Sequence, residues 1–182
     1  MMAFMGQLGR RLAGENIPLM KVSMRGDSTT YYANYAQHVV AYHLSQGEVL
    51  SVESENLLAF TSDCKYGLRF LGSGILSQKG LATTTLSAMG PNAFAAVLLD
   101  GNPIMLSNMQ NGQTLEVDPD AVVCWITNNA HSEPNFKTDV SWKSLLGQHS
   151  GESYMFEWNN GNRATVLIQP NERSGGIRVG ID

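Results

Sequence analysis

Charged residues are scarce in this chain: Asp, Glu, Lys and Arg make up 15% of its 182 residues, against about 25% in an average soluble protein. The 12 Lys and Arg are outnumbered by 16 Asp and Glu, and Arg10 and Arg11 form the only basic cluster in the sequence. Affinity for nucleic acid depends largely on counterion release by a basic surface. The composition therefore argues against nucleic-acid binding, and a surface this poor in charge suits burial in an assembly.

Cysteine and long apolar runs are also rare. Cys64 and Cys124 are the only cysteines, they form no Cys-x-x-Cys motif, and large apolar or aromatic residues lie near each. We expect buried free thiols. No apolar run approaches the roughly 20 residues that span a bilayer, and the opening residues 1–5 are too short for a signal-peptide core. The expectation is a cytoplasmic protein with no transmembrane segment.

Glycine, by contrast, is abundant, with 18 residues in the chain. Together with few Lys and Glu, this favours many short strands and tight turns over helices. Hydrophobic residues make up 43% of the sequence, which excludes general disorder. The length suits a single domain over residues 1–182.

An internal repeat is the most specific signal. Residues 47–60 match residues 112–125 at a constant offset of 65, with Gly, Leu and Val at the same places, acidic residues two apart, and a closing aromatic. The alternation of Leu50 and Val52 predicts a strand, the acidic residues predict a turn, and a second apolar strand follows. The apolar face of such a unit cannot be covered alone, so we expect the copies to pack on one another.

A fainter strand–glycine–strand pattern precedes each copy and occurs a third time near the end. It predicts repeats over about residues 11–74 and 75–145, and a half repeat over 146–182. Residues 140–146 differ, because Trp142, Leu145 and Leu146 have the spacing of one short amphipathic helix.

Residues 11–15, the repeated segments 47–60 and 112–125, and residues 151–169 together resemble the altered-inheritance-of-mitochondria family, in its bacterial branch. The resemblance implies a β-sandwich or double-stranded β-helix similar to the tryptophan RNA-binding attenuation protein, and an oligomer. In fungi the family is tied to mitochondrial inner-membrane organisation. Departures occur at Gln78-Lys79-Gly80, which lacks a Gly-Glu pair, and at Ser153. The family motif supplies structural glycines and core residues, so no catalytic residue is carried over.

Candidate catalytic and metal-binding groups are few. A cupin-like metal site needs three or four converging ligands, but His38 and His43 are five apart, on opposite faces of a strand, and His131 and His149 lie in a loop-rich segment. No Gly-x-Ser-x-Gly motif is present. Gly72-x-Gly74 lacks the third glycine of a dinucleotide loop, and we interpret it as a β-turn.

Two further groups of residues have plain structural interpretations. The acidic pairs Glu53/Glu55 and Asp118/Asp120 lack the dense oxygen-ligand series of a calcium loop, so we interpret them as solvated turns. Residues 30–35 predict an aromatic strand, in which Tyr31 and Tyr35 share one face and Tyr32 takes the other. We expect these tyrosines in core and subunit packing.

These observations predict an all-β domain of repeated antiparallel strands, closed into a sandwich or flattened barrel, that forms a cyclic homo-oligomer with a trimer as working model. The predicted function is a non-enzymatic scaffold or interaction protein of unknown partner, with no catalytic, cofactor-binding or metal-binding residues. Peripheral membrane association stays open. Two alternatives remain: an oligomeric ring that binds RNA or a small ligand, and a cupin-like metal enzyme built on His38 or His43.

Overall fold

The computed structural model describes residues 19–34, 36–71, 82–128, 132–138 and 154–170, and these form an all-β protein. The strands of the first half are β1 (His38–His43), β2 (Val49–Val52), β3 (Leu57–Phe60), β4 (Cys64–Phe70), β5 (Ala82–Ala88) and β6 (Phe94–Leu99). Those of the second half are β7 (Ile104–Ser107), β8 (Leu115–Val117), β9 (Val122–Thr127), β10 (Asn135–Thr138), β11 (Tyr154–Trp158) and β12 (Thr165–Ile168).

Every strand pairing among the described residues is antiparallel, so the predicted all-β, antiparallel class is confirmed. The only helical pieces in these ranges are two 3₁₀ turns, η1 (Ser54–Asn56) and η2 (Pro119–Ala121). The short helix predicted near residues 140–146 lies outside the described residues.

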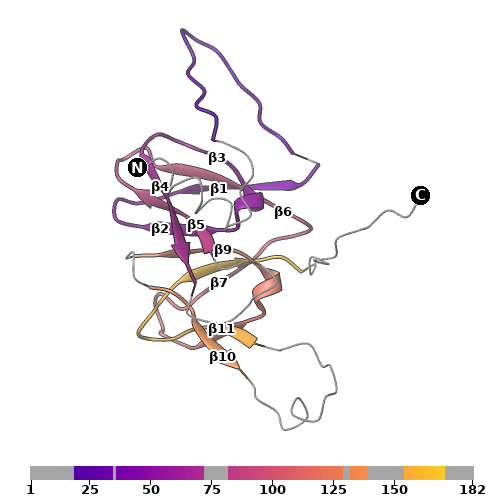
Figure 1. Cartoon of the computed structure of the whole chain (residues 1–182), viewed down its shortest axis with the longest axis vertical. Coiled ribbons are helices and arrows are strands. Elements are labelled where there is room, and N and C mark those ends of the chain that lie inside the picture. The colour runs from indigo at the N-terminus through magenta and orange to yellow at the C-terminus, as the bar shows by residue number, and fades with distance from the viewer. Residues whose placement is uncertain (1–18, 35, 72–81, 129–131, 139–153, 171–182) are drawn as a thin grey trace, which may run out of the picture.

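The strands form three sheets stacked in layers (Figure 1). A six-stranded sheet with the order β4-β5-β2-β9-β12-β7 lies between a sheet with the order β1-β6-β3 and a sheet with the order β10-β11-β8. Apolar side chains fill the two spaces between the layers. The molecule therefore has two cores that share one central sheet.

The first core lies between the β1-β6-β3 sheet and the central sheet, and it includes Leu50, Leu86 and Val97. The second core lies between the central sheet and the β10-β11-β8 sheet, and its largest members are Trp125 and Trp158. Strand β9 contributes to both cores. It places Val123 and Cys124 in the first core, and Val122 and Trp125 in the second.

The same pattern of strand pairing occurs twice along the chain. Strands β1 to β6 pair as β1-β6-β3 and β4-β5-β2, and strands β7 to β12 pair in the matching orders β7-β12-β9 and β10-β11-β8. We call residues 38–99 the first unit and residues 104–168 the second unit. Within the central sheet the two units are joined by one pairing, between β2 and β9.

A β-bulge occurs at the same place in both units. The β3–β6 register shifts between Leu57 and Ala59, so Leu58 has no partner in β6. The β9–β12 pairing shifts between Cys124 and Val122, so Val123, which lies 65 residues beyond Leu58, has no partner in β12. A bulge turns consecutive side chains away from strict alternation, which explains why the neighbouring residues Val123 and Cys124 both lie in the first core.

The repeated sequence segments 47–60 and 112–125 adopt the same local structure. Each opens on a glycine with positive φ, +92° at Gly47 and +64° at Gly112, a conformation that glycine adopts without steric cost. Each continues as strand, 3₁₀ turn and strand. The strand pairings divide the two units at residues 100–103, whereas the sequence pattern placed divisions near residues 74 and 145; those boundaries stay a prediction.

Candidate functional site

The two histidines that the structure describes lie apart at the ends of β1. His38 and His43 are both exposed, and the His43 ring contacts Phe94 edge to face with ring centroids 6.5 Å apart. Among the described residues, no three or more His, Cys, Asp or Glu side chains gather closely enough to hold a metal ion. His131 and His149 lie outside the described residues, as does the Gly72-x-Gly74 segment.

The acidic pairs lie at the two 3₁₀ turns, as the turn prediction requires. The carboxylate Oδ1 of Asp118 accepts a hydrogen bond of 2.9 Å from the backbone N–H of Asp120, which caps η2. The backbone N–H of Ala121 donates to the carbonyl of Asp118 at 3.0 Å, and that of Asn56 donates to the carbonyl of Glu53 at 3.0 Å. The two turns therefore share their backbone hydrogen bond, whereas the side-chain cap occurs in η2 and not in η1.

Both cysteines are buried and free, as the sequence predicted. Burial raises the pKa of Cys124 to about 12 even though the Tyr42 hydroxyl hydrogen-bonds the thiol. Burial likewise raises the pKa of Tyr42, and the neighbouring Cys124 raises it further. The pKa of Cys64 is also raised, mainly by burial. Because the thiolate is the reactive form of cysteine, these protonated thiols are poor nucleophiles.

An extended arm of residues 19–34 projects from the body of the molecule (Figure 1). It contains no strand or helix, so the prediction of an aromatic strand at residues 30–34 is wrong; Tyr35 lies outside the described residues. The prediction of core and subunit packing is wrong in its core part for Tyr31, which is 91% exposed, and its subunit part stays a prediction. A strand needs a hydrogen-bonded neighbour, and no described strand pairs with these residues.

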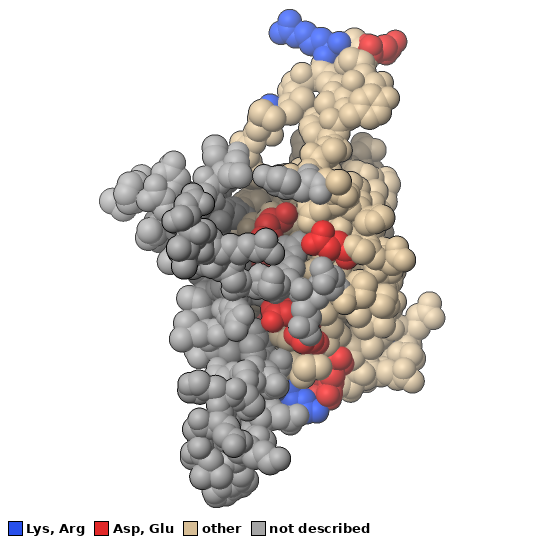
Figure 2. Space-filling view, turned by 90° about the vertical axis from the view of Figure 1, so that its right-hand side faces the viewer, with Lys and Arg blue, Asp and Glu red and all other residues tan. Residues whose placement is uncertain are grey.

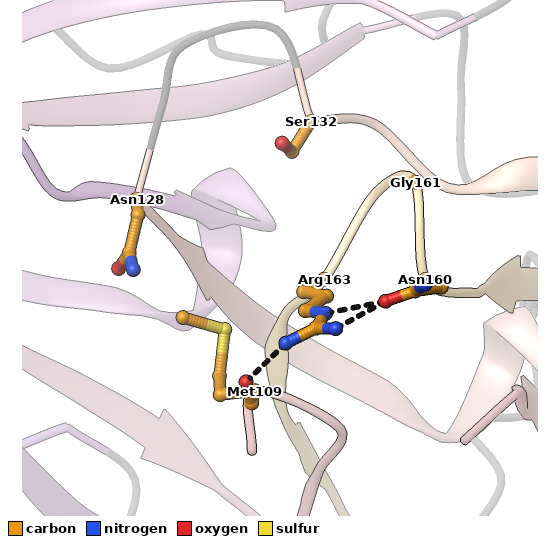
Figure 3. A pocket seen from close by; sticks show the side chains of 6 residues that line it. All are labelled: Met109, Asn128, Ser132, Asn160, Gly161 and Arg163. Atoms are coloured by element: carbon orange, nitrogen blue, oxygen red, sulfur yellow. Dashed lines mark hydrogen bonds between the residues drawn. The ribbon is translucent and has the colours of Figure 1, made fainter. Parts of the chain in front are cut away.

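A small pocket of about 290 Å³ lies beside Arg163 (Figure 3). Arg163 Nη1 donates to the carbonyl of Met109 at 2.9 Å, and Nε and Nη2 both donate to Oδ1 of Asn160. These bonds fasten the loop after β7 to the turn before β12. No carboxylate among the described residues pairs with Arg163, so its charge is available to a small anion.

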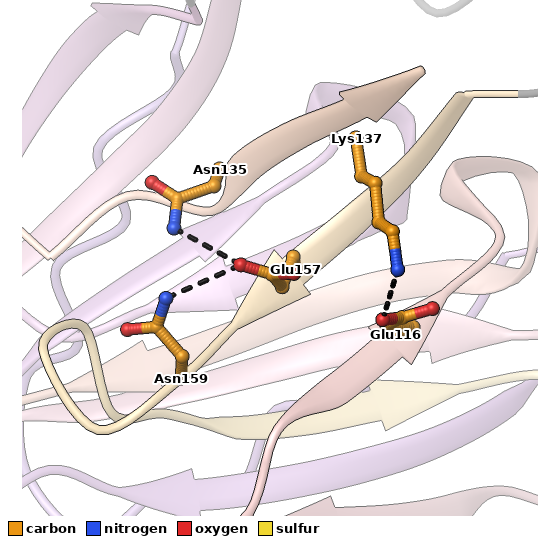
Figure 4. Close-up of polar contacts among 5 residues, drawn as sticks. All are labelled: Glu116, Asn135, Lys137, Glu157 and Asn159. Atoms are coloured by element: carbon orange, nitrogen blue, oxygen red, sulfur yellow. Dashed lines mark hydrogen bonds and ion pairs between the residues drawn. The ribbon is translucent and has the colours of Figure 1, made fainter. Parts of the chain in front are cut away.

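The outer face of the β10-β11-β8 sheet is polar, although its inner face is aromatic. Lys137 Nζ and Glu116 Oε1 form an ion pair of 2.6 Å, and Glu157 Oε1 accepts from Asn135 at 3.4 Å and Asn159 at 3.2 Å (Figure 4). Figure 2 shows more acidic than basic side chains among the described residues of one face of the molecule. Neither surface resembles the basic groove that binds single-stranded nucleic acid.

Fold and surface together define a class: an all-β protein of two similarly paired units, whose described surface includes an arm with exposed apolar side chains and a small pocket beside Arg163. A model of the mitochondrial biogenesis AIM24 family matches residues 2–171. The chain therefore belongs to the mitochondrial biogenesis AIM24 family. This confirms the family resemblance seen in the repeated segments.

A crystal structure of a Streptococcus pyogenes protein has a similar fold, with a TM-score of 0.53 and 16% sequence identity. The similarity covers 74% of this chain and 55% of that one, so the chain spans about half the length of its structural relative. No curated protein matches. Neither comparison shows a similarity to the tryptophan RNA-binding attenuation protein, so that similarity stays a prediction. None of the described residues belongs to a helix with the length and apolarity needed to cross a membrane.

Sequence reasoning missed the arm and the pocket. The run Asn159-Asn160-Gly161-Asn162 was a readable turn signal, but nothing local linked it to Met109, 50 residues earlier. The arm was missed because its tyrosines suit a strand as well as an exposed segment.

Proposed function

We propose that this protein is a non-enzymatic scaffold of the cytoplasm that assembles from copies of itself and offers the assembled surface to a partner. The observation that carries the proposal is the arm. Six of its large apolar side chains are exposed, namely those of Leu19, Met20, Val22, Met24, Tyr31 and Tyr32, and Met20 is 81% exposed. Exposed apolar side chains concentrated on one segment are typical of an interaction site, and the extended shape of the arm suits wrapping around another molecule.

Two further observations favour a scaffold over an enzyme. The pKa of each described thiol is raised by burial, so neither supports nucleophilic catalysis. The pocket beside Arg163 is small, and no Asp, Glu or His is among the described residues that line it. The free cysteines suit a reducing compartment. Peripheral membrane association rests on the family resemblance alone.

The test is native mass spectrometry of the full chain, compared with a variant in which Met20, Tyr31 and Tyr32 are replaced by serine. We expect an oligomer for the natural sequence and a smaller mass for the variant, because the arm loses most of its apolar contact area. An exposed pair, Asn111 and Gln113, replaced by serine serves as the control and should leave the mass unchanged. A natural chain that stays monomeric at micromolar concentration would contradict the proposal.

One second candidate has an observation in its favour. The Arg163 guanidinium has no carboxylate partner among the described residues, so an assembly that binds a small anionic ligand there is the alternative. Arg163→Gln keeps a hydrogen-bond donor for the Met109 carbonyl but removes the charge. A ligand mass that is retained by the natural chain and lost by this variant would favour the alternative over a pure scaffold.

A further inference from the structure

The two units differ in one respect: how they use equivalent strands. Strands β1 and β7 are equivalent, and each ends a sheet without a further described partner. Strand β2 is paired on both sides, by β5 and β9, whereas among the described strands its equivalent β8 is paired by β11 alone. Strand β9 is paired on both sides, whereas its equivalent β3 has β6 as its single partner in the part of the chain that the structure describes. The β2–β9 junction therefore leaves one edge on each unit whose equivalent is paired: β3 on the first unit and β8 on the second. We call these the unmatched edges.

The side chains of the two unmatched edges are those of an interface. In β9, Val123 and Cys124 are 1% exposed because they pack into the core of the other unit. Their equivalents in β3 are Leu58 and Ala59, which belong to neither core and are partly exposed. Edge strands are normally protected by charge, proline or a covering segment, and β3 has the sequence Leu-Leu-Ala-Phe.

Strand β8 offers the complementary edge. Leu50 and Ser51 of β2 are no more than 1% exposed at the existing junction. Their equivalents are Leu115, which is partly exposed, and Glu116, which is exposed. Glu116 is paired with Lys137 at 2.6 Å, so its charge is already balanced when another strand approaches.

We propose that β8 of one copy pairs with β3 of a second copy, and so repeats between chains the junction that β2 and β9 make within one chain. The established register places Ser51 opposite Trp125 and Val52 opposite Cys124. The equivalent partners are Glu116 opposite Phe60 and Val117 opposite Ala59. The new sheet would have the order β10-β11-β8 followed by β3-β6-β1 of the second copy, which matches the central sheet strand for strand.

The assembly is head-to-tail, because the surface offered by each copy differs from the one it receives. Such a contact forms a closed ring when its rotation closes, and a filament otherwise. The inference rests on the proposed function, since it names a contact that the assembling copies make in addition to the arm.

The experiment uses chemical crosslinking, with a short bis-maleimide, of two variants of the full chain that each add one cysteine, Glu116→Cys and Phe60→Cys, at positions that the proposed register places opposite each other. Mixed in equal amounts, the two variants should give a crosslinked dimer at least about tenfold more abundant than either variant gives alone, because opposed strands lie within about 5 Å of each other. The buried native cysteines should not react. The matched control replaces Phe60→Cys by Met105→Cys, which lies exposed on the β7 edge and should give no such dimer.

A blocking variant gives the second readout. Leu58→Lys places a charge at a site whose equivalent, Val123, is buried at the existing junction, so native mass spectrometry should show loss of the oligomer to the single-chain mass. Val39→Lys, on the exposed β1 edge of the same sheet, should leave the oligomer intact. An oligomer that survives Leu58→Lys and gives no selective crosslink would overturn the β8–β3 contact but leave the scaffold in place. A natural chain without any oligomer would overturn both.

Discussion

At the residue scale, Gly112 is subject to two constraints, a positive φ and a close contact with neighbouring side chains, whereas its counterpart Gly47 has only the positive φ. Both have positive φ, but a side chain at Gly112 would meet Asn160 Oδ1 at 2.7 Å and Arg163 Nη2 at 3.1 Å, whereas a side chain at Gly47 would meet nothing within 4 Å. Positive φ costs a side-chain-bearing residue about 1–2 kcal/mol. Because the two glycines occupy equivalent positions, comparing them separates the cost of positive φ from the cost of the close contact.

We predict that Gly47→Ala lowers the free energy of unfolding by about 1–2 kcal/mol, and that Gly112→Ala lowers it by about 1 kcal/mol more, because the Arg163–Asn160 contact must move. Urea unfolding of the two variants and the natural chain measures both values. Equal losses would show that the close approach at Gly112 contributes nothing.

The buried pair of Tyr42 and Cys124 predicts a loss of stability in alkali. Both acids have a pKa that is raised in the folded protein, so the folded state favours their neutral forms. Their contribution is fully present below pH 9.0, the ordinary pKa of the thiol, and is lost as the pH rises toward about 12, the pKa of folded Cys124. Below this window both groups keep their protons in the folded and the unfolded state. Within it, unfolding releases protons that the folded state holds.

The measurement is the urea midpoint at about pH 8 and about pH 10.5, for the natural chain and for Cys124→Ala. The natural chain should lose stability between the two values, and the variant should lose less, although it is weaker throughout because of the cavity left in the core. An identical pH dependence in both proteins would contradict the assignment to Cys124.

At the scale of elements, the loop between β7 and β8 is held by the buried side chain of Asn108 as well as by Arg163. Asn108 is fully buried; its Nδ2 donates to the carbonyl of Gln113 at 2.9 Å, and its Oδ1 accepts from the backbone N–H of Ala164 at 2.9 Å. Through these bonds the loop is fastened to the start of β12.

We predict that Asn108→Ala destabilises the protein by about 2–4 kcal/mol, because buried backbone groups lose their partners. Asn111→Ala in the same loop removes one exposed hydrogen bond, to the N–H of Gln113, and should cost less than about 1 kcal/mol. Thermal unfolding of both variants compares them. A small loss for Asn108→Ala would mean that water replaces the side chain.

The repeated strand–turn–strand elements were predictable because their information is local. Leu50 and Val52 alternate, the acidic residues favour a turn, and the constant offset of 65 shows which residues of the two copies correspond. The rest depends on contacts between distant residues. The β2–β9 junction, the bulge at Leu58 and the pocket at Arg163 leave no periodic signal, and the exposed tyrosines of the arm have the composition of a strand without its partner.

At the scale of the whole molecule, the two cores are coupled through β9 and β12. Val123 lies in the first core while Val122 lies in the second, so neither core can open without exposing residues of the same strand. We expect the described strands to unfold as one cooperative unit rather than as two domains.

Hydrogen exchange in low denaturant tests this prediction. The slowest amides of β2, in the first core, and of β11, in the second, should exchange with the same free energy and the same denaturant dependence. The exposed arm should exchange freely and serves as the internal reference. A β11 sheet that opens at a clearly lower free energy than β2 would show that the units are independent.

The duplicated pairing pattern also bears on the genetics of such a protein. A tandem duplication of one whole unit would add strands that reproduce the β2–β9 junction internally, while leaving one β3-type edge and one β8-type edge at the two extremes. Gene length could then change in steps of one unit without redesigning the contact surfaces, and what several chains accomplish together in one lineage could be encoded by a single longer chain in another.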